Sequence, residues 1–248
     1  MKLGIDLGSR FVKIAVKDGD EITFHREDTV AFYKNMVKRE GDETFIDLTK
    51  FGADEDAQIT ATGYGRNMMS FANANVISEI KAHYRGALEA TGESEFILVD
   101  IGGQDSKVIY VKDGYIEDFV MNDKCAASTG RFLENACRIL DVTLDELSQM
   151  TDEPVKMSAT CAIFSESELV GKIAEGVNIE YIGAGVNESI SRRLFPLIRK
   201  YRNKKIYAAG GVASNGAIIH FLSELSDTKI EVLNNPQYNG CLGCVYYM

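Results

Sequence analysis

The chain has 248 residues, of which 45% are hydrophobic and 26% charged, and its formal net charge at pH 7 is −10. This length and composition are typical of a globular protein with one large domain or two small ones. The negative charge argues against a nucleic-acid partner, because phosphate contacts require clustered Lys and Arg side chains. No apolar stretch reaches the roughly 20 residues of a membrane span. The N-terminus shows no charged-then-apolar leader, so we expect a cytoplasmic protein without a membrane partner.

The cysteines are five in number, at positions 125, 137, 161, 241 and 244. An odd number in a chain of this size is not typical of a disulfide framework. Thiols that stay reduced are free to bind metal. The three histidines are scattered and no two of them have the spacing of metal ligands, so no role is assigned to any of them.

An internal repeat is the strongest signal of the fold. Residues 3–19 read LGIDLGSRFVKIAVKDG, and residues 97–114 read ILVDIGGQDSKVIYVKDG. In both segments an apolar run ends in Asp-x-Gly, a short polar stretch leads to Lys, and a second apolar run ends in Lys-Asp-Gly. Each segment therefore predicts a β-hairpin with a tight glycine turn. The alignment of the copies matches Asp6 with Asp100, Gly8 with Gly102, and Lys13 with Lys107.

The remaining segments alternate between helical and strand patterns. Helices are predicted over 73–91, 130–140, 165–177, 183–201 and 214–225, the last with Ser214 as a plausible N-cap, and a short buried strand over 205–212. Such alternation indicates a mixed sheet covered on both faces. We therefore expect a duplicated α/β fold with an N-terminal half over 1–92 and a C-terminal half over 93–248.

The two glycine turns predict a nucleotide site in a cleft between the halves. Backbone N–H groups of such turns can bind a polyphosphate, and Lys13 can pair with a phosphate oxygen. Asp6, Asp100 and Asp105 are expected to face Mg²⁺ and its waters. Gly210 and Gly211 lie at the end of a strand, before a helix, and would let the backbone approach a base or ribose. The sequence contains neither a Walker A motif nor GxGxxG, which argues against P-loop and Rossmann folds.

Motifs spread over the whole chain resemble the ATP-dependent activators of 2-hydroxyacyl-CoA dehydratases and their relatives in benzoyl-CoA reductase systems. They are GIDLGSRFVK (4–13), TGYGR (62–66), DIGGQDSK (100–107), MNDKCAASTGRF (121–132), TCAIFSESE (160–168), GGVASN (210–215) and NPQ (235–237). That family belongs to the actin, Hsp70, sugar kinase and acetate kinase superfamily. The resemblance implies a duplicated actin-like (ribonuclease H-like) ATPase fold with two halves around a nucleotide cleft.

The resemblance also implies a nucleotide site with named residues. Those implied to be catalytic are Asp6, Asp100, Gln104 and Asp105, with Gln104 sensing the γ-phosphate. Those implied to bind ATP or ADP are Gly8, Ser9, Arg10, Phe11, Val12, Lys13, Gly102, Gly103, Gln104, Gly210, Gly211, Asn215 and Gln237. Tyr64 and Arg66 lie in the TGYGR motif, where a simple strand-to-helix turn is an equally good interpretation.

In the family a homodimer holds one 4Fe-4S cluster between its subunits, and by motif match Cys125 and Cys161 are the ligands here. ATP hydrolysis drives an electron from that cluster onto an iron–sulfur acceptor, a 2-hydroxyacyl-CoA dehydratase or a related double-cluster protein. A ferredoxin or flavodoxin is the implied electron source. Two cysteines per chain make four ligands only across a two-fold axis. From spacing alone, small buried core residues are the favoured interpretation of both cysteines.

Two departures from the family pattern leave alternatives open. The first turn reads Gly8-Ser9-Arg10, where the family usually has Thr after Ser, so the role of Arg10 is open. The C-terminus reads CLGCVYYM, where relatives usually carry alanine. Cys241 and Cys244 could bind metal as a CxxC pair, although core cysteines on a small-residue helix are the favoured interpretation, as for Cys137.

Two other functions compete with an ATP-driven electron donor. One is a small-molecule kinase-like ATPase of the same superfamily, which needs a second substrate pocket and leaves the cysteine motifs unexplained. The other is a regulatory ATP-binding module with a structural metal. Iron and sulfide analysis of anaerobically purified protein discriminates among the three.

Overall fold

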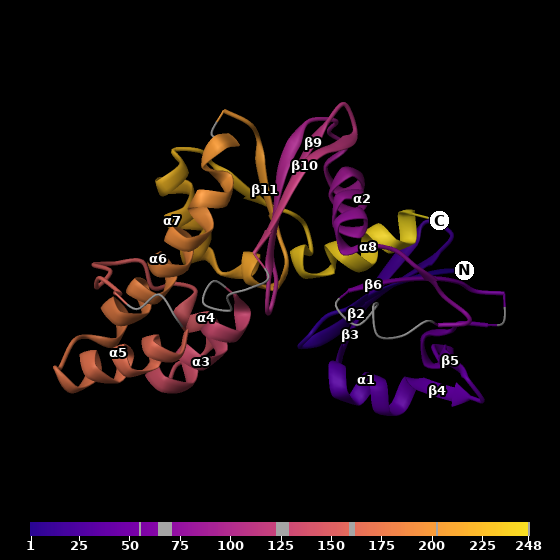
Figure 1. The fold of residues 1–248 in the computed structure, drawn as a ribbon, viewed down its shortest axis with the longest axis horizontal. Coiled ribbons are helices and arrows are strands. Elements are labelled where there is room, and N and C mark those ends of the chain that lie inside the picture. The colour runs from indigo at the N-terminus through magenta and orange to yellow at the C-terminus, as the bar shows by residue number, and fades with distance from the viewer. Residues whose placement is uncertain (55, 64–70, 123–128, 159–161, 202, 248) are drawn as a thin grey trace. The chain divides into compact units, whose positions relative to one another are not determined.

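The computed structural model of the chain describes residues 1–54, 56–63, 71–122, 129–158, 162–201 and 203–247. These residues form two compact units, which are described separately (Figure 1). Unit 1 contains Met1–Glu93 together with Leu233–Met248, and unit 2 contains Ser94–Val232.

Unit 1 is built on a five-stranded sheet with helices on both faces. Its elements are β1 (Lys2–Leu7), β2 (Phe11–Asp18), β3 (Glu21–Asp28), α1 (Thr29–Met36), β4 (Val37–Glu40), β5 (Glu43–Ile46), β6 (Gln58–Gly63), β7 (Asn75–Val76), α2 (Glu79–Thr91) and α8 (Asn239–Tyr246). Short 3-10 turns lie at Thr49–Phe51 and Pro236–Tyr238.

Unit 2 has a second five-stranded sheet and most of the helices. Its elements are β8 (Phe96–Ile101), β9 (Ser106–Lys112), β10 (Tyr115–Asn122), α3 (Gly130–Leu140), α4 (Leu144–Leu147), α5 (Ala162–Ala174), α6 (Ile179–Ile198), β11 (Ile206–Ala209), α7 (Gly216–Ser226) and β12 (Ile230–Val232). 3-10 turns lie at Arg199–Tyr201 and Gly211–Ser214.

The two sheets have the same topology. The strand order is β3-β2-β1-β6-β7 in unit 1 and β10-β9-β8-β11-β12 in unit 2. In each sheet the first three strands in chain order form antiparallel pairs, and the last two join in parallel. Each strand of one sheet therefore has a counterpart in the other, which confirms the predicted duplication of an α/β unit and both predicted hairpins.

Strand β1 shows how the sequence pattern separates two faces of the unit 1 sheet. Leu3, Ile5 and Leu7 alternate along it and join a core that includes Phe32 and Met36 of α1. The intervening residues face the other side, because side chains along a strand alternate. On that side Asp6 is buried, with 6% of its surface exposed. The alternation thus places the Asp-x-Gly carboxylate on the face opposite α1.

Helix α8 covers this second face with its backbone in close contact. Ala15, Cys241 and Val245 form a small core there. A side chain at Gly86 of α2 would overlap the carbonyl of Asn239, and one at Gly243 would overlap the carbonyl of Ala82. Glycine at these two positions lets α2 and α8 pack at backbone distance.

The C-terminal segment differs from the division expected from the sequence, which assigned all of 93–248 to the second half. Leu233–Met248 belongs to unit 1, because α8 packs on β1, β2 and α2. In Figure 1 this yellow helix lies beside the strands of the N-terminal unit. The other expected boundary, after residue 92, lies one residue from the observed one.

The predicted helices exist, with shifted ends. The bounds of α3 are those predicted, whereas α2 begins at Glu79 rather than at residue 73, because the Ser78 side chain caps it by accepting from Lys81 N. Helices α5 and α6 each begin three or four residues earlier than predicted. The predicted Ser214 cap of α7 is wrong: Asn215 caps it, through Oδ1 and Ile218 N at 2.9 Å.

The core of unit 2 is larger than that of unit 1. Most of its buried residues come from β8, β9, α3, α6, β11 and α7, and α4, α5 and β12 each add one. Within the described part of the chain, no helix is long and apolar enough to cross a bilayer.

Candidate nucleotide site

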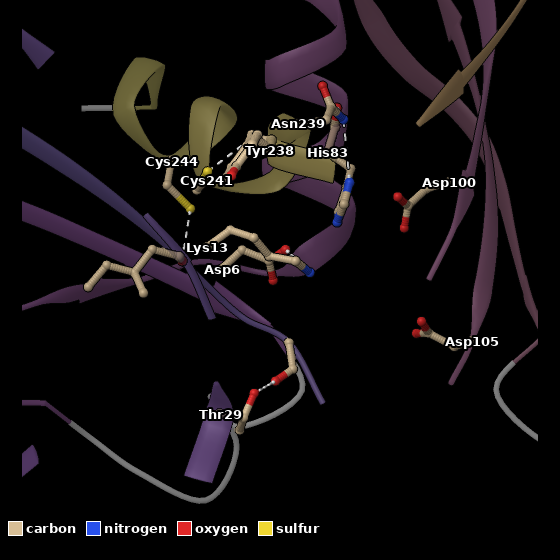
Figure 2. Close-up of polar contacts among 12 residues, drawn as sticks. Asp6, Lys13, Thr29, His83, Asp100, Asp105, Tyr238, Asn239, Cys241 and Cys244 are labelled. Carbon is tan, nitrogen blue, oxygen red and sulfur yellow. Dashed lines mark hydrogen bonds and ion pairs between the residues drawn. The ribbon is translucent and has the colours of Figure 1, made fainter. Parts of the chain in front are cut away.

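The first glycine turn joins β1 to β2 and carries an ion pair. Asp6 and Lys13 are cross-strand partners, with Lys13 Nζ 3.5 Å from Asp6 Oδ2. The turn is closed by Gly8 N, which donates to Asp6 O at 3.0 Å, and by Thr29 Oγ1, which donates to Gly8 O at 2.8 Å (Figure 2). A Cβ at Gly8 would lie 2.5 Å from Phe11 O and 2.9 Å from Lys13 Nζ, so the turn has no room for a side chain.

The second turn, between β8 and β9, repeats this arrangement in unit 2. Asp100 and Lys107 are cross-strand partners, with Nζ 3.6 Å from Oδ2. Lys107 Nζ also lies 2.7 Å from Asp105 Oδ2. Gly102 N donates to Asp105 O at 2.9 Å, and a Cβ at Gly102 would lie 2.8 Å from Asp105 Oδ1. The predicted match of Asp, Gly and Lys between the two turns is thus confirmed in three dimensions.

The second turn is also joined to the start of α3. Gly130 N donates to Gly102 O, and Arg131 N donates to Gly103 O, each at 3.0 Å. Both donors lie in the first turn of α3, where helical N–H groups have no partner within the helix. The turn and the helix are therefore mechanically connected within unit 2.

Gly210 lies where β11 ends, next to the Asp100 carboxylate. Its φ of +88° lies in the region that favours glycine. A Cβ at this position would overlap Ile101 O and lie 2.8 Å from Asp100 Oδ1. Gly211, in contrast, is exposed, and a Cβ there would meet nothing within 4 Å.

The other residues predicted to bind nucleotide differ in what their side chains contact. Gln104 is exposed in the second turn, whereas Val12 is fully buried in the core of unit 1, so only its backbone can face a ligand. Arg10 pairs with Asp28 at 2.9 Å, and its guanidinium lies 4.7 Å from the centre of the Phe11 ring. Ser9 is half-buried.

Asn215 and Gln237 occupy different units. The amide of Asn215 is engaged within unit 2, because Nδ2 donates to Asn187 Oδ1 at 3.1 Å and Oδ1 caps α7. Gln237 is half-buried in the 3-10 turn that precedes α8 and belongs to unit 1.

The predicted cluster ligands Cys125 and Cys161 lie outside the described residues, as do Tyr64 and Arg66. The helices that follow the two cysteines are described, and α3 and α5 pack together in unit 2. Asn135 Nδ2 of α3 donates to Glu166 Oε1 of α5 at 2.7 Å.

The other three cysteines are core residues, as favoured from the sequence. Cys137 is 8% exposed, and Cys241 and Cys244 are fully buried on α8. Cys241 Sγ donates to Tyr238 O at 3.1 Å, and Cys244 Sγ donates to Ile5 O at 3.7 Å (Figure 2). In the parts of the chain that are described, no three His, Cys, Asp or Glu side chains are grouped as metal ligands.

His83 and Asn239 lie beside the first glycine turn, although the sequence did not single out either residue. Both are buried in unit 1, and Asn239 Nδ2 donates to His83 O at 2.9 Å. Figure 2 shows the His83 ring next to the Asp6–Lys13 pair. No other histidine lies at a spacing that would suggest a shared metal or catalytic role for His83. Its position is therefore visible only in the fold, where α8 packs on α2.

The residues of both turns suit ATP with Mg²⁺. Carboxylates such as Asp6 and Asp100 are hard oxygen donors, which Mg²⁺ prefers. Lys13, whose side chain is partly exposed, supplies an ammonium group of the kind that pairs with phosphate. The glycines exclude side chains from both turns, so backbone N–H groups can approach a phosphate.

Comparison with known proteins agrees with this chemistry. The activator of lactoyl-CoA dehydratase from Anaerotignum propionicum is 37% identical over 251 residues, which cover 99% of this chain and 96% of that protein. The solved activator of 2-hydroxyisocaproyl-CoA dehydratase from Clostridium difficile, with bound ADPNP, superimposes with a TM-score of 0.83 at 33% identity, over 99% of this chain and 93% of that one.

The crystal structure of component A of (R)-2-hydroxyglutaryl-CoA dehydratase from Acidaminococcus fermentans gives a TM-score of 0.82 at 33% identity, over 99% and 96% of the two chains. These similarities confirm the predicted duplicated actin-like ATPase fold. Residues 3–247 match one family over nearly the whole chain, and the protein therefore belongs to the BadF/BadG/BcrA/BcrD ATPase family.

Proposed function

We propose that this protein is a homodimeric, ATP-dependent activator that delivers electrons from a subunit-bridging 4Fe-4S cluster to a partner iron–sulfur enzyme. A 2-hydroxyacyl-CoA dehydratase is the partner class that we favour. The observation that carries the proposal is the duplicated Asp–Lys turn in a chain whose relatives are named activators of such dehydratases.

We propose that one ATP with Mg²⁺ is bound by both glycine turns. Asp6 and Asp100 would orient the metal and its waters, and Lys13 would pair with a phosphate oxygen. Bound Mg²⁺ neutralises charge that develops on the phosphates during hydrolysis. Gln104 is exposed in the second turn and is our candidate for contact with the γ-phosphate. The backbone at Gly210 and Gly211 would approach the adenosine.

We propose Cys125 and Cys161 as the cluster ligands of each subunit. Cys161 directly precedes α5, and Cys125 precedes α3 by five residues. The hydrogen bond between Asn135 and Glu166 ties the second turns of these two helices together, so the helices that follow the two cysteines are packed as one piece of unit 2. A cluster with four thiolate ligands then requires two copies of the chain. When bound, the cluster supplies the transferable electron, which we propose comes from a ferredoxin or flavodoxin in the cytoplasm.

The contact between the second turn and α3 supports coupling between ATP and electron delivery. Gly102 O and Gly103 O are held by the first N–H groups of α3. A change in this turn when the γ-phosphate is present or lost would therefore shift the start of the helix that follows Cys125. Such coupling requires that ATP and ADP differ in affinity for the two conformations.

The test is the iron and sulfide content of anaerobically purified variants. Wild type should be brown and contain one 4Fe-4S cluster per dimer. Cys125→Ser and Cys161→Ser should each lose the cluster, because oxygen is a poor replacement for thiolate on soft iron. Cys241→Ser and Cys244→Ser, on α8, are the matched controls and should keep it. Unchanged iron in the Cys161 variant would contradict the proposal.

A further inference from the structure

His83 of α2 is a buried imidazole beside the first ion pair of the proposed nucleotide site. Only 6% of its surface is exposed. Figure 2 shows one ring nitrogen facing Asn239 of α8 and the other facing the side of Asp6 and Lys13. All of these residues lie in unit 1. The ring therefore lies between a fixed amide and the functional carboxylate.

The amide of Asn239 fixes which ring nitrogen of His83 carries the proton. Asn239 Nδ2 donates to the backbone carbonyl of His83 at 2.9 Å, and a carbonyl can only accept. The same Nδ2 lies 3.4 Å from His83 Nδ1. Nδ1 therefore faces a donor and acts as the acceptor. In the neutral imidazole the hydrogen is then on Nε2, on the side of Asp6 and Lys13.

The Nε2–H group of His83 and the Asp6 carboxylate both lie close to Gly240 of α8. A Cβ built on Gly240 would lie 3.1 Å from His83 Nε2 and 3.1 Å from Asp6 Oδ2. The two atoms are thus no more than twice that distance apart, over the backbone of α8. Two hydrogen bonds of about 2.9 Å each let a single water join atoms up to about 5.8 Å apart, which covers most of the separations that this limit allows. Any side chain at residue 240 would fill the space between them.

The charges around this place favour a bridge from His83 to Asp6. Lys13 offers only donors, so it cannot accept from Nε2–H, whereas the Asp6 carboxylate only accepts. The ion pair between Lys13 and Asp6 is long, at 3.5 Å. When Lys13 turns to a phosphate, Asp6 loses this partner and needs another donor to keep its orientation.

We propose that His83 is a positioning residue of the ATPase site, which donates Nε2–H through one water above Gly240 to the Asp6 carboxylate and so holds it toward the metal. The proposal rests on the function proposed above. Asn239 contributes indirectly, because its contact with Nδ1 fixes the tautomer of His83. Residues that orient a metal-facing carboxylate in this way change metal affinity and turnover, while contacts to the nucleotide itself stay in place.

The test compares His83→Gln with His83→Asn. The Gln amide reaches the position of Nε2 and keeps a donor toward Asp6, whereas the shorter Asn amide reaches only the position of Nδ1. His83→Asn should lower kcat for ATP hydrolysis about 10- to 100-fold, with KM for ATP within about threefold of wild type. His83→Gln should recover most of the loss. Lys81→Gln, on an exposed position of the same helix, is the control and should behave as wild type.

A second readout does not depend on turnover. ADP affinity is titrated with and without Mg²⁺, and the gain in affinity on adding Mg²⁺ is compared among the variants. His83→Asn should lose about 10-fold of that gain, with ADP affinity in EDTA unchanged. Equal behaviour of the Gln and Asn variants in both assays, at wild-type thermal stability, would overturn the proposal for His83. Absence of Mg²⁺-dependent ATP hydrolysis in wild type would instead refute the proposed function, and the Mg²⁺-linked ADP affinity would still decide the role of His83.

Discussion

Asp100 and Lys107 form an almost completely buried ion pair across the β8–β9 hairpin, with side-chain exposures of 3% and 2%. Its counterpart in unit 1, Asp6 with Lys13, is more open, at 9% and 19%. The two copies of one motif therefore differ in how strongly each lysine is required by the fold.

Lys107→Met should destabilise the protein much more than Lys13→Met. Removal of Lys107 leaves the buried Asp100 carboxylate without its cation, which costs about 3–5 kcal/mol for a buried pair. Lys13 is partly solvated, so its loss should cost clearly less. Urea denaturation without nucleotide measures both free energies of unfolding. Equal losses would show that burial does not distinguish the two turns.

Asp6→Ala should reduce Mg²⁺-dependent hydrolysis more than nucleotide binding. The carboxylate is expected to orient metal and water, while turn backbone and Lys13 contact the phosphates. ATPase rates and ADP affinity are measured on the same preparation. An equal loss of both, together with a lowered melting temperature, would point to a collapsed turn instead.

Gly210→Ala and Gly211→Ala should have different effects, the first on the stability of the fold and the second on nucleotide binding. The first should lower the free energy of unfolding by about 1–3 kcal/mol, because φ is +88° and the new Cβ overlaps Ile101 O. The second should leave stability unchanged, since its Cβ has open space. If Gly211 lies beside the adenosine, Gly211→Ala should weaken ADP binding at wild-type stability. Unchanged ADP affinity in that variant would remove Gly211 from the site.

Stability should fall at alkaline pH because of two thiols. Burial, together with the negative charge of Asp6, raises the pKa of Cys241 and of Cys244 well above the ordinary value of 9.0. Below pH 9 both the folded and the unfolded chain keep these thiol protons, so the two thiols do not make stability depend on pH there. Above it the unfolded chain loses them first, and the free energy of unfolding drops by up to about 1.4 kcal/mol per pH unit for each thiol.

The control for this pH effect is the double variant Cys241→Ala/Cys244→Ala. Its free energy of unfolding, measured by urea denaturation from pH 7 to pH 10, should decline less steeply above pH 9. Parallel curves for the two proteins would contradict the assigned pKa direction.

ATP should strengthen binding of the acceptor enzyme, and ADP should not. The contact between the second turn and α3 gives the nucleotide a route to the region after Cys125. Affinity for a purified 2-hydroxyacyl-CoA dehydratase is measured with ADP and with a non-hydrolysable ATP analogue, for wild type and Gln104→Ala. The variant should lose the difference between nucleotides. Identical wild-type affinities would show that nucleotide does not gate docking.

The hairpins could be predicted because their signal is local. Asp, Gly and Lys recur at matched spacing, and the strand pairing then places each Asp opposite its Lys. The unit to which α8 belongs could not be predicted, because its small residues suit either sheet. Close contacts in the fold, such as the fit of Gly243 against Ala82, show where it packs. The position of His83 beside Asp6 could not be predicted for a related reason, since its partner Asn239 is 156 residues away in the chain.

The return of Leu233–Met248 to unit 1 affects the order in which the protein can form during synthesis. Unit 2 is one continuous segment and can fold as soon as it has left the ribosome, since domains generally fold as units. Most of unit 1 precedes unit 2 in the chain, yet the helix that covers Ala15 and supplies Asn239 is made only after unit 2. A nascent chain would therefore expose one face of its first sheet until α8 has been made, and a truncation before residue 233 would leave that face without this helix.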